Sequence, residues 1–235
     1  AGAKTKAQEL IERDKVDVIF GDVKVEAAVE SSRGTWVAND ASVAYAARDR
    51  FVGLRIKDWM QTAGKAFKVE YLVVDPAGQP AAGSAVELQL QRQTITRVRV
   101  KNGAGDFTPE EHVKWLTEDR CTAVSTNAPA SCALTPKQAG DFRVVGSVID
   151  AHARTQKSVL STWVTGAGEV VWSQSGKGVT LVPDKSSYHV GDTAHVLVQN
   201  PYPGARALLT IERYGVLWKK IVTLQGSAPV IDVPI

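Results

Sequence analysis

The chain has 235 residues, which is enough for one large domain or two compact ones, on a prior of roughly 100 to 200 residues per domain. Its 44% hydrophobic and 23% charged residues are ordinary for a soluble globular protein. The net charge is only +3, and no apolar run approaches the roughly 20 residues of a membrane-spanning helix. These values disfavour a nucleic-acid-binding protein and a span of the bilayer within this sequence.

The first residues show no signal-peptide core, which leaves export open because a mature chain has lost its signal. Only residues 4–13 have a helical pattern, in which Ala7, Leu10 and Ile11 share one face between charged residues. The pattern predicts a short helix that packs against a domain. A helix on a membrane surface is the alternative, but the apolar face is small.

A divergent repeat predicts the domain boundaries. Gly21-Asp22 matches Gly140-Asp141 at an offset of 119, and the Thr-Trp-Val segments around Trp36 and Trp163 match at an offset of 127. Gly64 and Gly191 keep the offset of 127. The last part of the repeated unit therefore occurs twice, at 21–50 and 140–172. Its first part also occurs twice, at 51–92 and 179–213. We expect one whole domain over 51–172, preceded by the last part of another domain (1–50) and followed by the first strands of a third (173–235).

The middle segment has the alternation of half-buried strands. Phe67, Val69, Tyr71 and Val73 alternate with polar or outward residues, and 86–90 repeats the pattern after a turn at 75–78. Further strands are predicted at 95–101, 114–123, 131–135, 142–149 and 157–164, with a long loop at 102–111 and a short strand at 170–172. About seven strands in some 120 residues favour a two-sheet antiparallel sandwich.

Residues 181–217 read as three short strands joined by turns. Ala194, Val196 and Val198 fall on one face, as do Ala207, Leu209 and Ile211 in the next strand. Gly191-Asp192 and the proline-rich segment 201–204 have turn chemistry, and Tyr214-Gly215 is expected to close a hairpin.

Two cysteines, Cys121 and Cys132, flank a segment that contains Asn127 and Pro129. A turn there would bring the two together, and a disulfide closing so short a loop would contribute on the order of 3 kcal/mol. Two unrelated buried thiols remain the alternative. A zinc site is disfavoured because structural zinc needs four ligands and the nearest histidine, His112, stands alone.

No assembled catalytic or metal site emerges from the sequence. It contains no nucleophile elbow, phosphate-binding glycine loop, His-Glu-x-x-His or Cys-x-x-Cys motif. Glu110, Glu111 and His112 form the most catalytic-looking cluster, but adjacent residues of an extended loop point in different directions. His189 and His195 would meet only through the pairing of strands. We therefore predict no catalytic residue, no metal and no cofactor, and interpret 110–112 as a solvated acidic loop.

Two further patterns have both a functional and a structural interpretation. Arg97, Arg99 and Lys101 alternate along one face, as a polyanion-binding stripe would, but no aromatic platform accompanies them, and a solvated outer face is favoured. Sugar-binding sites stack rings on exposed aromatics, but the tryptophans here are scattered, and core or interdomain burial explains them more simply. The six tryptophans are Trp36, Trp59, Trp115, Trp163, Trp172 and Trp218.

The C-terminal segment resembles the bacterial branch of the alpha-2-macroglobulin family. The matching elements are the pair Asp184-Lys185, Tyr188, the turn 190–192, the proline loop 201–205 and the strand with its turn at 209–216. Some fifteen matches in order over about forty residues make the resemblance fairly specific. In that family the segment opens the domain that carries the protease bait region. Paired cysteines in a hairpin also fit the family, which favours a Cys121–Cys132 disulfide.

The resemblance implies an all-β chain of tandem macroglobulin-type domains, which are sandwiches like fibronectin or immunoglobulin domains. It implies non-catalytic, structural modules of a broad-spectrum protease inhibitor, a trap triggered by cleavage of the bait. Its partners would be target proteases, neighbouring domains of the same chain and a periplasmic cell-wall synthase, with no nucleic acid and with membrane contact only through an anchor elsewhere. We expect a periplasmic bacterial protein. The alternatives are a passive stalk of a surface adhesin and a glycan-binding module.

Overall fold

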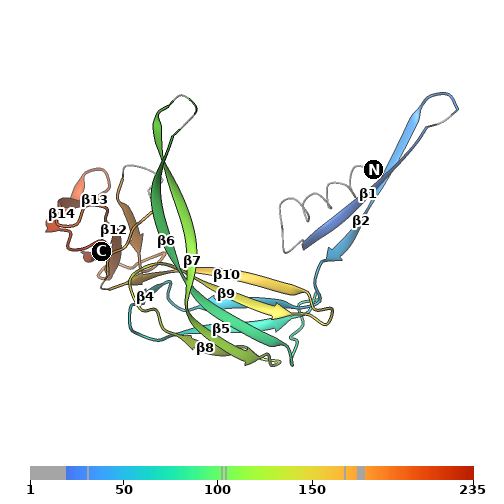
Figure 1. Ribbon diagram of the computed structural model, residues 1–235, viewed down its shortest axis with the longest axis horizontal. Helices are drawn as coiled ribbons and strands as arrows, with labels where there is room; N and C mark the ends of the chain where they lie inside the picture. The colour runs from blue at the N-terminus through green and yellow to red at the C-terminus, as the bar shows by residue number, and fades with distance from the viewer. Residues whose placement is uncertain (1–19, 31, 102, 104, 167, 174–177) are drawn as a thin grey trace.

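The structure, a computed structural model, describes residues 20–30, 32–101, 103, 105–166, 168–173 and 178–235. Every regular element within these ranges is a β-strand, as Figure 1 shows, so the prediction of an all-β fold is confirmed. In the same ranges we find no helix long and apolar enough to cross a bilayer. The helix predicted at 4–13 lies outside the described residues.

A two-layered sandwich forms the middle of the chain. One sheet has the strand order β4-β10-β9-β6-β7, and the facing sheet has the order β3-β5-β8. Neighbouring strands run antiparallel, except that β10 pairs with β4 in parallel. The strands are β3 (Phe51–Ile56), β4 (Met60–Thr62), β5 (Phe67–Val74), β6 (Ala85–Lys101), β7 (Phe107–Val124), β8 (Ala130–Leu134), β9 (Gly140–Ile149) and β10 (Thr155–Thr165).

The alternation read from the sequence fills the space between these sheets. Val69, Tyr71 and Val73 of β5 are buried, and they belong to the same core cluster as Leu88 and Leu90 of β6. Successive side chains of a strand point to opposite faces, so every second residue of β5, and of β6 from Val86 to Leu90, enters the core. Strands β9 and β10 of the larger sheet contribute further buried residues to this core, namely Phe142, Val144, Val148 and Val164.

A disulfide joins the two sheets at one side of the sandwich. Cys121 of β7 and Cys132 of β8 are bonded, with their Cα atoms 6.1 Å apart. These strands belong to different sheets, and Cys132 is itself part of the buried core. The bond therefore closes the edge at which the two layers would otherwise separate.

Strands β6 and β7 continue far beyond the sandwich as a two-stranded ribbon. β6 pairs with β9 only from Val86 to Arg92, whereas its pairing with β7 extends to Lys101 opposite Phe107. We call residues 93–101 and 107–115 the ribbon; it projects from the sandwich in Figure 1. The predicted break between 86–90 and 95–101 is thus wrong, and so is the loop at 102–111, because residues 107–111 begin β7.

A second hairpin, β1 (Phe20–Glu30) and β2 (Trp36–Ala46), precedes the sandwich. Its register places Glu30 opposite Trp36, and the β9–β10 hairpin places Ile149 opposite Thr155. Both turns therefore have the same length, and Trp36 corresponds to Thr155 at the offset of 119. The predicted match of Trp36 with Trp163 is wrong: the two residues lie at opposite ends of equivalent strands.

The longer offset arises in the linker that follows β10. Ile56 lies opposite Val69, and Pro183 lies opposite Val196, so these two strand pairs match at an offset of 127. The eight residues by which 127 exceeds 119 consequently fall between β10 and β11, in the segment 166–179. Residues 169–173 of this linker belong to no strand, which corrects the strand predicted at 170–172.

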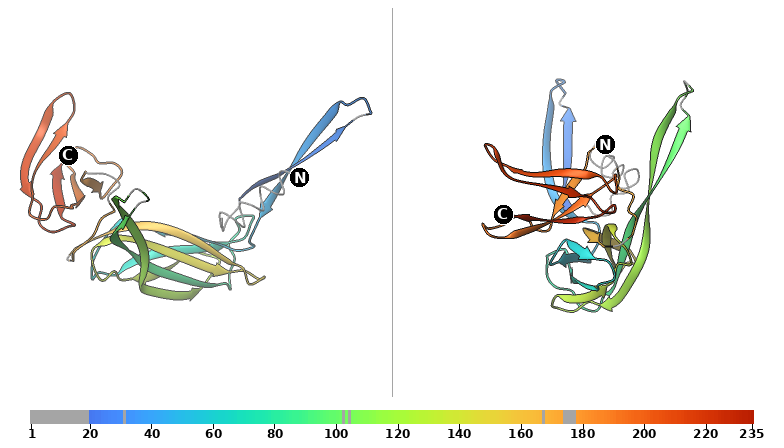
Figure 2. Two further views of the ribbon diagram at one scale, coloured as in Figure 1. Left: turned by 45° about the horizontal axis from the view of Figure 1, so that its top comes forward. Right: turned by 90° about the vertical axis from the view of Figure 1, so that its left-hand side faces the viewer.

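The C-terminal unit contains two small sheets. One has the order β11-β12-β15 and the other is the hairpin β13-β14. Its strands are β11 (Thr180–Pro183), β12 (Thr193–Gln199), β13 (Arg206–Glu212), β14 (Val216–Thr223) and β15 (Val230–Pro234). The predicted hairpin closure is confirmed: Tyr214 has a φ of 55° and Gly215 a φ of 149°, so the turn uses the left-handed region. Figure 2 shows this unit at the end of the sandwich opposite to the β1–β2 hairpin.

Candidate functional site: the junction after the sandwich

A small apolar cluster joins the C-terminal unit to the sandwich. Its buried members are Ala139 from the sandwich, Trp172 from the linker, and Leu197 and Ala228 from the C-terminal unit. Partly buried apolar residues from the same three parts pack around them, namely Met60, Trp163, Val170 and Val182. We call this cluster the junction. Apolar contacts from three successive segments resist separation of the two bodies, because separation would expose them to water.

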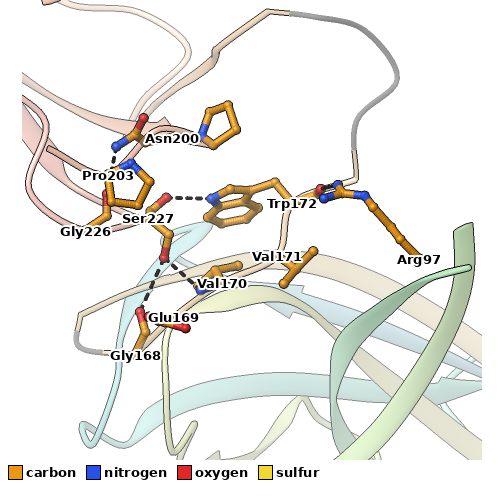
Figure 3. A pocket seen from close by; sticks show the side chains of 11 residues that line it. Arg97, Gly168, Glu169, Val170, Val171, Trp172, Asn200, Pro203, Gly226 and Ser227 are labelled. Atoms are coloured by element: carbon orange, nitrogen blue, oxygen red, sulfur yellow. Dashed lines mark hydrogen bonds between the residues drawn. The ribbon is translucent and has the colours of Figure 1, made fainter. Parts of the chain in front are cut away.

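Trp172 is the central side chain of the junction. Its indole is only 6% exposed and lies 6.0 Å from the ring of Trp163, centroid to centroid, at an interplanar angle of 56°. Its Nε1–H donates a hydrogen bond of 2.6 Å to the backbone oxygen of Ser227 (Figure 3). Burial alternates along the linker, with Val170 and Trp172 turned inward and Val171 and Ser173 exposed.

Polar contacts across the junction satisfy groups that burial would otherwise leave unpaired. The backbone N–H of Val170 donates to Ser227 Oγ at 2.7 Å, and the same hydroxyl lies 3.4 Å from the oxygen of Gly168. A second indole also crosses the junction, because Trp59 Nε1–H donates to the backbone oxygen of Pro183 at 2.8 Å. Hydrogen bonds are directional, so these bonds favour one orientation of the C-terminal unit relative to the sandwich.

The ribbon reaches the linker through a pair of opposite charges. Arg97 of β6 and Glu111 of β7 face each other, with Nε and Oε1 2.9 Å apart. Arg97 Nη2–H donates to the backbone oxygen of Trp172 at 2.8 Å, and Ser173 Oγ–H donates to Glu111 Oε2 at 2.9 Å. Arg97 is exposed, in agreement with the predicted solvated face, but it also bonds to the linker, which that interpretation did not include. The interpretation of Glu111 as part of a solvated loop is wrong, because Glu111 belongs to β7 and its carboxylate is partly buried against the linker.

A pocket of about 330 Å³ lies between the ribbon, the linker and the C-terminal unit. Arg97 and Trp172 line it together with Pro203, Gly226 and Ser227 (Figure 3). Asn200, which also lines it, is buried and satisfied: its amide donates to Gly226 O at 2.8 Å and its Oδ1 accepts from Tyr202 N at 2.9 Å. The buried amide of Asn200 is thus used within the C-terminal unit.

A carboxylate borders the junction. Asp141 of β9 lies opposite Trp163 of β10, so both side chains share the outer face of the larger sheet. Burial raises the pKa of Asp141 to about 6. Arg143, two residues along the same face, stacks over Trp115 with its Cζ 4.2 Å from the ring centroid and donates to Gln91. Asp141 therefore ionises at a higher pH than an ordinary aspartate does, and it is largely protonated only below about pH 6.

The other end of the sandwich has a polar junction with the preceding segment. Arg48 donates through Nε to the backbone oxygen of Thr155 at 3.2 Å, and His152 lies 3.9 Å from Asp49. Asp150 organises the turn beside them, since it accepts from the backbone of His152 and pairs with Arg154 at 2.7 Å. The two ends of the sandwich are thus joined by different chemistry, polar on one side and mainly apolar on the other.

The remaining sequence candidates do not form a catalytic group. His112 and Glu110 are exposed and 3.6 Å apart, while Glu111 points to the linker from the opposite face of the ribbon. His195 pairs with Asp232 at 2.7 Å across β12 and β15, and His189 lies beside Asp192. Among the residues that the structure describes, no three metal-ligating side chains come together.

The family-like residues of the C-terminal unit hold its first turn. Asp184 Oδ1 accepts a hydrogen bond from Tyr188 Oη at 2.7 Å and another from the backbone N–H of His195 at 2.9 Å. Burial raises the pKa of Asp184, but these hydrogen bonds outweigh it and leave that pKa below its usual value. Asp184 and Tyr188 thus serve the fold of this unit, and no ligand group is needed to explain them.

The tryptophans divide into two groups. Trp163 and Trp172 are packed at the junction, and Trp59 is half-exposed but bonded across it, in agreement with interdomain burial. Trp36, in contrast, is 62% exposed at the start of β2, where burial in a core or between domains was expected. Sequence reasoning missed Ser227 and the Arg97–Glu111 pair; only the register of β6 with β7 reveals the latter.

Comparisons with known proteins agree with these features. The family model of the alpha-2-macroglobulin bait region domain matches residues 179–235, which is the C-terminal unit. An alpha-2-macroglobulin homolog from Nostoc sp. is 32% identical over 210 residues, covering 89% of this chain. The chain spans only 11% of that relative's length.

Solved structures of bacterial alpha-2-macroglobulins are also similar, though at low scores. The native conformation of the E. coli protein has a TM-score of 0.44 at 18% identity, and the match covers 91% of this chain and 14% of that one. The E. coli protein activated by porcine elastase has a TM-score of 0.41 at 13% identity, covering 91% and 23% respectively.

Proposed function

We propose that this chain, which belongs to the bacterial alpha-2-macroglobulin family, supplies non-catalytic framework domains to a broad-spectrum protease inhibitor. The observation that carries the proposal is the Nostoc match over 89% of the chain, together with the bait-region-domain match at 179–235. In the proposed mechanism a protease cleaves the bait, the array of domains rearranges, and the attacking protease is held. The residues described here position domains; none of them takes part in a reaction.

The proposed division into domains assigns 1–50 to the end of one macroglobulin-type domain, 51–172 to a complete one, and 173–235 to the beginning of the domain that bears the bait. Two observations support it. The core of the sandwich is closed within β3 to β10, and the bait-region-domain match begins at residue 179, just beyond the linker residues 168–173. The proposal places Trp172 at the boundary between two domains, where a rearrangement would be transmitted.

The proposed partners are target proteases and the neighbouring domains of the same protein, and the proposed location is the periplasm. A disulfide supports an exported protein, because such bonds persist in oxidising compartments and are rare in reducing ones. Elastase activates the E. coli relative, and we propose that proteases act on this protein in the same way. Stiff sandwiches joined at defined junctions fit a framework that has to hold one arrangement until it is cut.

The experiment is limited proteolysis of the full-length protein, followed by native-gel mobility and assay of bound protease. We expect a single early cut to change the mobility and to leave protease attached. The control is the same protease blocked at its active site, which should change neither. Unchanged mobility with no retained protease after the cut would favour a passive stalk instead.

A further inference from the structure

The Arg97–Glu111 pair divides its bonding between the ribbon and the linker. Each residue uses one contact for the other and a second contact for the linker: Arg97 holds the oxygen of Trp172, and Glu111 holds the hydroxyl of Ser173. The Arg97 side chain is 40% exposed and the Glu111 side chain is 25% exposed, so the pair lies at the surface and is partly open to water. Two adjacent linker residues are thus bound to the two strands of one hairpin.

The ribbon carrying this pair contacts the sandwich at its base, where Arg143 lies over Trp115, and contacts the linker further out. Beyond Arg92 the backbone of β6 pairs only with β7, and Figure 1 shows the two strands leaving the sandwich together. An isolated two-stranded hairpin is marginally stable, and it bends more readily than the packed sheet from which it grows. The Arg97–Glu111 pair therefore connects the packed junction to a two-stranded ribbon that bends more easily.

We propose that the ribbon is a latch, closed in this structure, that holds the linker so that Trp172 stays seated between the sandwich and the C-terminal unit. When the latch opens, the linker loses both ties, Trp172 leaves its place, and the C-terminal unit is free to turn. The burial of Trp172 and its bond to Ser227 O already stabilise the closed state. The latch adds further stabilisation to this position of Trp172. The inference concerns this chain alone and stands whether or not the parent protein inhibits proteases.

The indole N–H of Trp172 reports the state of the latch directly, because it is buried and bonded only when the residue is seated. The experiment measures its hydrogen exchange by NMR in the 235-residue chain and in Arg97→Ala. We expect exchange to become at least tenfold faster, while core amides such as those of Leu88 and Val144 keep their rates. Glu111→Gln combined with Ser173→Ala should accelerate the indole in the same direction without removing a cation from the ribbon.

Arg99→Ala is the matched control, since Arg99 lies on the same strand face, two residues further from the sandwich, opposite Pro109. It should leave the exchange of the Trp172 indole within twofold of the parent. If Arg97→Ala and the double variant also leave it within twofold, the latch does not exist. If every variant accelerates the core amides as much as the indole, the pair stabilises the whole sandwich and the latch is likewise refuted.

Discussion

The indole N–H of Trp172 donates to the backbone oxygen of Ser227 across 55 positions of the chain, at 2.6 Å. This bond joins the linker to the segment that leads into β15, while the ring itself stacks beside Trp163 of the sandwich. The Trp172 side chain thus contacts both the sandwich and the C-terminal unit. Its removal should change how the two are placed relative to each other more than it destabilises either of their cores.

Replacement of Trp172 should loosen the C-terminal unit. Loss of a buried Trp side chain costs about 3–5 kcal/mol in a closed core, and somewhat less at a junction that can relax. Trp172→Phe keeps the apolar contact and loses only the hydrogen bond, worth about 1 kcal/mol. Hydrogen exchange by mass spectrometry should therefore rise in 193–199 and 224–228 in the order parent, Phe, Ala.

Trp36→Ala is the control for this series, because Trp36 is exposed and distant from the junction in the fold. It should leave exchange in 193–199 and 224–228 unchanged. Equal effects of the Trp36 and Trp172 variants would contradict the role assigned to the junction.

Reduction of the disulfide should destabilise the sandwich without unfolding its core strands outright. Cys121 and Cys132 are separated by 11 residues, and closing such a loop stabilises by on the order of 3 kcal/mol through the unfolded state. Urea unfolding of the Cys121→Ser, Cys132→Ser double variant, compared with the parent with and without reductant, measures the loss. A double variant as stable as the oxidised parent would show that the bond is dispensable.

The stability of the chain should depend on pH through Asp141. Its folded-state pKa of about 6 lies above the usual 3.8, so its contribution to stability is complete below 3.8 and is lost as the pH rises through 6. The Asp141→Asn variant cannot ionise at this position. Its free energy of unfolding, relative to that of the parent, should therefore increase by on the order of 1 kcal/mol from acid to neutral pH, after allowance for partial exposure.

The measurement for Asp141 is urea unfolding of both proteins at about pH 3.5 and about pH 7.5. Glu169→Gln removes an exposed carboxylate from the neighbouring linker and serves as the control. A constant difference between Asp141→Asn and the parent over this interval would refute the pH dependence.

Gly146 should resist substitution because two core side chains occupy its open face. A Cβ atom there would lie 2.8 Å from Leu54 Cδ2 and 3.1 Å from Leu88 Cδ2. Overpacking of this kind costs about 1–3 kcal/mol, so Gly146→Ala should lower the urea midpoint. Gly53→Ala, on strand β3 with its nearest atom 3.7 Å from the added Cβ, should change it little.

Local alternation was sufficient to predict the sandwich, and the junction needed information that alternation does not contain. Val69, Tyr71 and Val73 reveal their burial through their own spacing, because the pattern of a strand is set by its two faces. Arg97 and Glu111 are fourteen residues apart, and only the register of β6 with β7 brings them together. The same limit explains the wrong loop at 102–111, because residues 107–111 have no apolar alternation and are placed in a strand only by their pairing with β6.

The equivalence of Trp36 and Trp163 failed for a related reason. The match rested on three identical letters, Thr-Trp-Val, although the strand pairs Glu30–Trp36 and Ile149–Thr155 require the constant offset of 119. With that offset the eight additional residues fall in the linker, next to Trp172. The insertion therefore lengthens the linker that carries Trp172, the central side chain of the junction.

The most direct test of a fixed junction is the distance distribution between spin labels on the two bodies, measured by double electron–electron resonance. Exposed positions Lys157 on β10 and Thr210 on β13 are suitable, with labels carried on non-canonical amino acids so that the disulfide remains intact. We expect one narrow distance in the parent and a broad distribution in Trp172→Ala. A broad distribution in the parent, or a narrow and unchanged one in the variant, would contradict a junction held by Trp172.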